Sequence, residues 1–218
     1  MRILAGPCQH ETLEQSSEIA KECKRVCEKY NITYYFKASF DKANRTSDNG
    51  VRGVGLERSM LDFKTIKDCH GIPIITDVHS AYQVENIEYE YGDAVDVYQI
   101  PAKGILTKTE TAKQIWITER GTSFGYNNLV VDFNGIQYMI NKLGVPIIFD
   151  ATHSCQQPGG LGHATGGNRS NIAGLTRAAS ALGVTNFFLE VHSDPDNAPS
   201  DGDNMLRLED FERTVDDI

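Results

Sequence analysis

Residues 146–154 read P-I-I-F-D-A-T-H-S, a short apolar run that ends abruptly in polar side chains. The run does not alternate between apolar and polar residues, which favours a β-strand covered on both faces over a strand with one wet face. Such strands occur in parallel sheets that helices flank. The stretch therefore predicts an α/β protein with polar groups at the carboxyl end of this strand.

Six further segments have the same character, and amphipathic stretches separate them. The expected strands are Arg2–Ala5, Thr33–Ala38, Pro73–Val78, Val95–Ile100, Gln114–Thr118, Pro146–Phe149 and Asn186–Glu190. The expected helices are Glu14–Tyr30, Gly55–Cys69, Ala81–Tyr91, Asn134–Leu143 and Asn171–Leu182. This rhythm of strand then helix predicts a parallel sheet with right-handed crossovers.

Polar residues follow every one of these strands. They are Gly6-Pro7-Cys8, Lys37-Ala38-Ser39, Asp77-Val78-His79, Gln99, Glu119-Arg120, Asp150-Ala151-Thr152-His153 and Glu190-Val191-His192. In a (β/α)₈ TIM barrel those strand ends surround the active site. We therefore predict one barrel domain over residues 1–218, with its working face at these positions.

One interval departs from the barrel pattern. Closure requires eight strands, whereas seven are expected, and the residues between Ala102 and Lys113 leave no room for a further strand and helix. A seven-stranded version would expose parallel edges, which proteins avoid. We therefore expect that one βα unit is absent from this sequence between Ala102 and Lys113.

Composition narrows the class of protein. The net charge of −9 and the pI near 5.1 argue against nucleic acid as a partner. No apolar run has the roughly 20 residues that span a bilayer, and the start M-R-I-L-A-G-P-C is too short for a secretory signal. Five cysteines without C-x-x-C spacing are typical of free thiols. We expect a cytoplasmic protein that does not bind membranes.

The densest group of charged residues is F-K-A-S-F-D-K-A-N-R-T-S, residues 36–47. Lys37, Lys42 and Arg45 repel one another unless an anion lies among them, and their side chains suit phosphate or carboxylate. The alternative is a solvated basic loop, which the position directly after a strand disfavours. Arg52 either joins this group or caps the following helix.

A second, dispersed group offers metal ligands. Cys8, His153, Glu190 and Asp201 suit a divalent ion such as zinc, iron(II), manganese or cobalt. Taken singly, a cysteine such as Cys8 is more often a small buried apolar residue than a metal ligand. Further polar residues at the carboxyl ends of the strands, the mouth of the barrel, either line the site or only form hydrogen bonds near it. The glycine-rich stretch 158–167 is either a lid over the site or a turn. These mouth residues are Asp77, His79, Gln99, His163 and His192.

These motifs, in this order, resemble the 3-deoxy-D-manno-octulosonate 8-phosphate synthase family. The resemblance rests on A-G-P-C from Ala5, residues 36–47, R-G-V-G-L-E from Arg52, T-D-V-H from Thr76, Q-I-P-A from Gln99, T-E-R-G-T-S-F-G-Y-N-N-L-V-V-D from Thr118, D-A-T-H-S from Asp150, P-G-G-L-G from Pro158 and E-V-H from Glu190. The related 3-deoxy-D-arabino-heptulosonate 7-phosphate synthases carry K-P-R-T-S where this chain has K-A-N-R-T-S from Lys42. The resemblance implies condensation of phosphoenolpyruvate with arabinose 5-phosphate, for lipopolysaccharide biosynthesis.

The resemblance also implies roles for single residues. Phosphoenolpyruvate would contact Lys37, Ser39, Lys42, Arg120 and Lys103; arabinose 5-phosphate would contact Asn44, Arg45 and Ser47; Asp77 and Gln99 would line the site. Cys8, His153, Glu190 and Asp201 match the ligands of the metal-dependent branch, and Lys42, Asp77, His153 and Cys8 are the expected catalytic groups. The family is expected to form homotetramers.

Three other functions remain open. One is a heptulosonate phosphate synthase that accepts erythrose 4-phosphate. Another is a non-catalytic barrel that binds sugar phosphate, if the βα unit is missing from the molecule. A metal-dependent aldolase is the third, although it would not require Lys37, Lys42 and Arg120 together.

Overall fold

The computed structural model describes residues 1–42, 52–100, 114–125, 127–160 and 166–218. Seven parallel strands form a curled sheet in the order β4-β3-β2-β1-β11-β8-β5, and a short strand, β12, pairs with β11. The strands are β1 (Arg2–Gly6), β2 (Thr33–Lys37), β3 (Ile74–Asp77), β4 (Val97–Gln99), β5 (Ile117–Glu119), β8 (Ile147–Asp150), β11 (Asn186–His192) and β12 (Leu206–Arg207). All seven expected strands are confirmed, most of them with shorter bounds.

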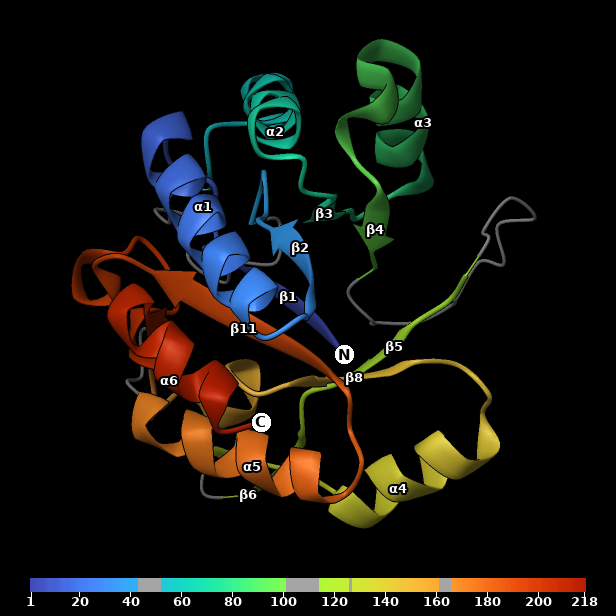
Figure 1. Ribbon diagram of the computed structural model, residues 1–218, viewed down its shortest axis with the longest axis vertical. Helices are drawn as coiled ribbons and strands as arrows, with labels where there is room; N and C mark the ends of the chain where they lie inside the picture. The colour runs from blue at the N-terminus through green and yellow to red at the C-terminus, as the bar shows by residue number, and fades with distance from the viewer. Residues whose placement is uncertain (43–51, 101–113, 126, 161–165) are drawn as a thin grey trace.

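The curled sheet does not close into a barrel within the described residues. β4 and β5 are its two ends, and no pairing joins them there. Figure 1 shows the opening between these two strands, with α3 above it and α4 below. The molecule is therefore a half-barrel of the TIM type and differs from the expected closed (β/α)₈ barrel.

Helices cover the outer side of the sheet (Figure 1). They are α1 (Leu13–Lys29), α2 (Leu56–His70), α3 (Ala81–Tyr91), α4 (Phe133–Lys142), α5 (Ile172–Ala181) and α6 (Phe211–Asp216). The Thr12 hydroxyl caps α1 by accepting from the Gln15 amide, and Gly71 ends α2 in the left-handed conformation that glycine adopts freely. No described helix has the length and apolar character needed to cross a membrane.

The core has two parts, because successive side chains of each strand point to opposite faces. Ile3, Phe149 and Phe187 pack outward against the helices in the large cluster. Leu4, Ile148 and Phe188, their neighbours in sequence, form the small inner cluster with Ile75, and Trp116 packs against its edge. Burial on both faces is the reason why these strands read as unbroken apolar runs.

Several short elements were not expected from the sequence. β6 (Thr122–Gly125) and β7 (Asn128–Val130) form an antiparallel hairpin directly after β5. β9 (Gln156–Gln157) pairs with β10 (Gly166–Gly167), so that both ends of the described part of the glycine-rich stretch are held together. Six short 3₁₀ turns complete the elements of the described chain. The hairpin and the β9–β10 pair both lie at the carboxyl ends of sheet strands.

A buried polar network ties α1 to α2. The His10 ring lies 2.8 Å from the Ser16 hydroxyl and 3.0 Å from an Asp62 carboxylate oxygen, which also accepts from Arg58. Burial lowers the pKa of His10, and the nearby Asp62 offsets only part of that effect. His10 therefore stays neutral in the folded protein at a pH where it is protonated in the unfolded chain.

We expect this histidine to make the fold sensitive to mild acid. Below about pH 6.5 the unfolded chain binds a proton that the folded protein resists, so the free energy of unfolding falls as pH is lowered, by up to about 1.4 kcal/mol per pH unit. Denaturant unfolding between pH 5.5 and 7.5 measures this slope. His10→Asn, which cannot titrate, should show a shallower slope, and equal slopes in the two proteins would contradict the assignment.

Candidate active site

Cys8 is positioned by the close approach of β1 and β2. A side chain at Gly6 would lie 2.1 Å from the Lys37 carbonyl oxygen, so only glycine fits where the strands meet. Beyond the strands, the His10 amide donates to the Ser39 carbonyl at 2.9 Å and the Ser39 amide donates to the Cys8 carbonyl at 3.4 Å. The loop after β1 therefore continues alongside the loop after β2, and it holds Cys8 beside Ser39.

Two lysine ammonium groups converge on one hydroxyl. Lys37 Nζ lies 3.1 Å and Lys42 Nζ 2.9 Å from Ser39 Oγ. Lys37 is 4% exposed. Burial opposes the positive charge of Lys42, but Cys8, Glu190 and Asp77 around it outweigh burial, and the pKa of Lys42 is raised. Lys42 therefore stays cationic, and beside the buried Lys37 it forms a cationic site that suits an anion.

Asp77 closes the far side of the lysine pair. Its carboxylate lies 3.6 Å from Lys37 Nζ and 3.4 Å from His79 Nε2. Burial acts to raise the pKa of Asp77, yet Lys37 and Lys42 lower it overall. Gln99 lies opposite Asp77 in the β3–β4 register, and its buried side-chain oxygen has no hydrogen-bond partner among the described residues. Asp77 thus lies beside Lys37, and Gln99 lies on the neighbouring strand at the register position of Asp77.

Three of the four expected metal ligands meet at one point. The ligand atoms of Cys8, Glu190 and Asp201 all lie within 4.8 Å of one another. His153 approaches from the side, with Nε2 3.4 Å from Glu190 Oε1, but does not belong to this group of three. These residues come from the loop after β1, from β11, from the loop after β11 and from the turn after β8.

The donor set fits a divalent cation. Both carboxylate oxygens of Glu190 are buried and have no hydrogen-bond partner in the described part of the chain. A buried carboxylate is costly unless cations neutralise it, and among the described ion pairs Glu190 has only the 3.4 Å contact with His153. Burial, together with Glu190, raises the pKa of the Cys8 thiol well above its usual range. The thiolate form of Cys8 therefore also requires a cation close to the sulfur. Thiolate, imidazole and carboxylate ligands suit zinc or another borderline divalent metal.

Asp150 orients His153. One Asp150 oxygen lies 2.6 Å from His153 Nδ1, and the other accepts from the His153 amide at 2.9 Å and from the Thr152 hydroxyl at 3.1 Å. Thr152 Oγ1 in turn accepts from the Glu190 amide. Burial disfavours a charged His153, but Asp150 and Glu190 raise the pKa of His153 overall. The contact with Asp150 directs Nε2 of the ring toward Glu190.

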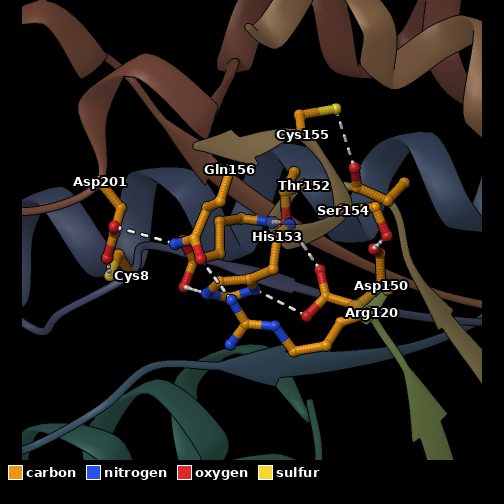
Figure 2. Close-up of polar contacts among 12 residues, drawn as sticks. Cys8, Arg120, Asp150, Thr152, His153, Ser154, Cys155, Gln156 and Asp201 are labelled. Carbon is orange, nitrogen blue, oxygen red and sulfur yellow. Dashed lines mark hydrogen bonds and ion pairs between the residues drawn. The ribbon is translucent and has the colours of Figure 1, made fainter. Parts of the chain in front are cut away.

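Gln156 joins Arg120 to Asp201 (Figure 2). The Arg120 guanidinium donates to Gln156 Oε1, and Gln156 Nε2 donates to Asp201 Oδ1 at 3.0 Å. The other Asp201 oxygen accepts from Cys8 Sγ at 3.3 Å and from the Ser200 hydroxyl at 2.9 Å. Asp201 has a left-handed backbone, with φ 53°. Its carboxylate is thus held from both sides in a backbone conformation that few residues other than glycine adopt.

Several residues expected at the site lie outside the described part of the chain. They are Asn44, Arg45, Ser47, Lys103 and His163. Arg52, the first described residue after residues 43–51, forms a bidentate ion pair with Asp41, with N–O distances of 2.9 and 2.6 Å. The Lys42 amide also donates to the Arg52 carbonyl at 2.8 Å. Arg52 thus fastens the base of this loop and does not cap α2, whose N-cap is Gly55.

Sequence reasoning missed two residues of this site. Asp150 stands three residues before His153, and this Asp-x-x-His spacing is the signal that would have paired them. Gln156 carries no such signal, because its partners Arg120 and Asp201 are both distant in the sequence. His192, in contrast, contacts Glu11 at 2.9 Å and Gln15 at 2.8 Å, and belongs to a separate polar group at the start of α1.

The sequence of this half-barrel matches the family model of the DAHP synthetase I family over residues 1–107 and 104–217. The chain belongs to this family. Family members named 2-dehydro-3-deoxyphosphooctonate aldolase are similar over nearly the whole chain. The protein of Rickettsia bellii (strain OSU 85-389) is 43% identical, covering 98% of this chain and 88% of its own length. That of Bradyrhizobium diazoefficiens is 42% identical, covering 98% and 86%. That of Brucella abortus (strain S19) is 42% identical, covering 96% and 86%. The resemblance noted from the motifs is confirmed.

The alignments to family members contain more positions than this chain supplies. The match to the Rickettsia bellii protein extends over 247 positions, and 98% of 218 residues is about 214, which leaves about 33 positions to that protein alone. The family model is matched in two stretches that meet at residues 104–107. This junction falls in the interval from Ala102 to Lys113, where a βα unit was expected to be absent.

Proposed function

We propose that this protein condenses phosphoenolpyruvate with D-arabinose 5-phosphate and water, giving 3-deoxy-D-manno-octulosonate 8-phosphate and inorganic phosphate. The relatives are named for the same eight-carbon sugar acid phosphate. The observation that carries the proposal is the pair of lysines, Lys37 and Lys42, that converges on Ser39 beside the cluster of Cys8, Glu190 and Asp201. One place in the molecule thus offers both an anion site and a cation site.

Lys37, Ser39, Lys42 and Arg120 hold phosphoenolpyruvate in this proposal. Two ammonium groups and a hydroxyl suit its carboxylate or phosphate, and Arg120 adds a guanidinium that contacts Gln156 beside Asp201. Lys103 joins them by family resemblance. Fixing two polyanions at bonding distance offsets their mutual repulsion and the entropy of association, which is the main requirement of this reaction.

The bond changes define what the remaining residues must do. C3 of phosphoenolpyruvate forms a bond to the aldehyde carbon of the aldose, water adds at C2, and the C2–O bond to phosphate breaks. Asn44, Arg45 and Ser47 hold the aldose phosphate in this proposal, and Asp77 and Gln99 line the site. Lys42 stays protonated next to Cys8 and Asp77, so it stabilises the negative charge that develops on the aldehyde oxygen or on the leaving phosphate.

Cys8, His153, Glu190 and Asp201 hold a divalent metal ion in this proposal, with zinc, iron(II), manganese and cobalt as the candidates. Such an ion supplies a Lewis acid for an oxygen atom of the substrate or of water. The unpartnered Glu190 oxygens support this role. His153, oriented by Asp150, faces the cluster with the ring nitrogen that a ligand would use.

The absence of one βα unit would explain why β4 and β5 are the two ends of the described sheet and do not pair. We propose that this chain is one barrel domain over residues 1–218 that lacks the unit which closes the barrel in its relatives. The two-part family match and the additional positions of the Rickettsia bellii protein support this. We also propose a homotetramer, by family resemblance, and a cytoplasmic location, which five free cysteines support.

A comparison of acceptor sugars tests the reaction. Phosphate release from phosphoenolpyruvate should be faster with arabinose 5-phosphate than with erythrose 4-phosphate, by at least about tenfold in kcat/KM, because loop residues 43–51 match the former class. Preference for the four-carbon sugar would assign the chain to the heptulosonate enzymes instead. Binding of both substrates without phosphate release would favour the non-catalytic sugar-phosphate-binding barrel, which the open sheet makes a real alternative.

A further inference from the structure

We propose that Gln156 is a positioning residue that couples the binding of phosphoenolpyruvate to the binding of the metal ion. The inference rests on the proposed function, because it concerns the same anion and metal sites. Gln156 touches neither the lysine pair nor the Cys8 thiol in the described contacts. It lies between Arg120, on the anion side, and Asp201, on the metal side (Figure 2).

The chemistry of its neighbours fixes the orientation of the Gln156 amide. Arginine can only donate hydrogen bonds, and an ionised carboxylate can only accept them. Gln156 Oε1 must therefore face Arg120, and Nε2 must face Asp201, as the structure has them. A flipped amide would set two donors against each other and two acceptors against each other. Only a side chain with one donor end and one acceptor end satisfies both neighbours.

The Gln156 side chain has little freedom to respond in any other way. The residue is 8% exposed, and its backbone pairs with Gly167 in the short β9–β10 ladder. The backbone N–H of Gln156 donates to the His153 carbonyl oxygen and so joins Gln156 to the turn that carries His153. A shift of Arg120 toward an anion therefore moves the amide dipole that holds Asp201 Oδ1, and a shift of Asp201 toward a metal ion acts back on Arg120.

Asp201 is the ligand most dependent on such support. Its backbone has φ 53°, and it lies in a loop after β11, whereas Glu190 lies within that strand. The Gln156 bond fixes Oδ1, which leaves Oδ2 directed at Cys8. Ligands on loops need fixed neighbours to keep the geometry of a metal site, and loss of such a neighbour typically weakens metal binding by about 10- to 100-fold.

The test measures cobalt(II) affinity with and without phosphoenolpyruvate. Cobalt(II) bound to a thiolate absorbs in the near ultraviolet, so the titration reports the occupied site without turnover. In the wild-type protein we expect phosphoenolpyruvate to tighten cobalt(II) binding at least about fivefold, and cobalt(II) to tighten phosphoenolpyruvate binding by the same factor, as linkage requires. In Gln156→Met, which keeps the volume but neither hydrogen bond, the factor should fall below about twofold.

Gln157→Met is the matched control. Gln157 is the next residue of the same strand, but its amide donates to Asn128 at 3.0 Å, away from the metal cluster. This variant should keep the full coupling factor. Gln156→Asn gives a second test if the methionine variant fails to fold, since an amide one methylene shorter cannot reach both neighbours and should also lose the coupling.

The outcomes separate the two proposals. Equal coupling in wild type and Gln156→Met, or a wild-type protein that binds both ligands independently, overturns the role of Gln156 and leaves the proposed function in place. Loss of coupling in Gln157→Met as well would show a general effect of altering the strand, and it also overturns the role. A wild-type protein that binds neither cobalt(II) nor phosphoenolpyruvate overturns the proposed function, and this inference with it.

Discussion

Cys8→Ala should lose its bound metal and at least about a hundredfold in turnover. Alanine removes the one sulfur ligand and leaves the buried Glu190 and the half-buried Asp201 as two carboxylates close together, without the thiolate that completes the group. The repulsion that remains disfavours recapture of a metal ion. Elemental analysis of the purified protein and phosphate release under saturating substrates measure the two losses together.

Cys69→Ala is the control for this experiment. Cys69 is an exposed free thiol near the end of α2, outside the cluster, so its removal should change neither metal content nor turnover. The expected result for Cys8 depends on the metal being needed for the reaction. A Cys8→Ala protein that is free of metal and fully active would show that the cluster is not a metal site required for catalysis.

If the proposed βα unit is absent from this chain, supplying it should close the sheet and produce the largest gain in stability. We expect a chimera that carries the additional segment of the Rickettsia bellii protein, joined at Ala102 and Lys113, to melt at a temperature roughly 10 °C higher. The new strand would pair with the free edges of β4 and β5 and cover Ile100 and Ile115, which are 48% and 43% exposed. Covering the exposed half of these two side chains contributes about 1.5 to 3 kcal/mol, and each kcal/mol shifts Tm by about 2 to 4 °C in a protein of this size.

The same chimera should also turn over faster. If the restored segment completes the site as the proposed function requires, kcat/KM for arabinose 5-phosphate should rise at least about a hundredfold. An insert of equal length made of glycine and serine is the control, and it should change neither quantity upward. If the graft leaves melting temperature and kcat/KM unchanged, the opening between β4 and β5 is not a missing unit.

The strands could be predicted because burial on both faces of the sheet gives each of them a run of consecutive apolar residues. Ile3, Leu4 and Ala5 are all buried, on alternate faces of β1, so the strand reads as an apolar run. The bounds were poorest at β5, predicted at Gln114–Thr118 and observed at Ile117–Glu119. β5 is an edge strand, so fewer contacts fix where it begins. The β6–β7 hairpin was missed because its turn depends on Asn127 in the left-handed conformation, which many asparagines adopt without forming a turn.

The site was less accessible to sequence reasoning than the fold. The lysine pair stands within one short segment, so Lys37, Ser39 and Lys42 were found together. The metal cluster joins Cys8 to Asp201 across 193 positions, and no local spacing marks it. Residue chemistry alone made its four ligands a weak prediction that the resemblance strengthened, and the structure brings the ligand atoms of three of them within 4.8 Å of one another. Gln156 escaped notice because a lone glutamine after a polar turn has no distinguishing pattern.

Because Asp41 and Arg52 form an ion pair, residues 43–51 can be replaced without breaking the contact between the two segments that flank them. The ion pair and the backbone bond from Lys42 fasten these two segments to each other, independently of what joins them. Changing the length of such a connection is thermodynamically mild, since each doubling costs only about 0.6 kcal/mol. Under the proposed function, substitutions between Lys42 and Arg52 can therefore change the preference for a four- or five-carbon acceptor while the Asp41–Arg52 ion pair is kept.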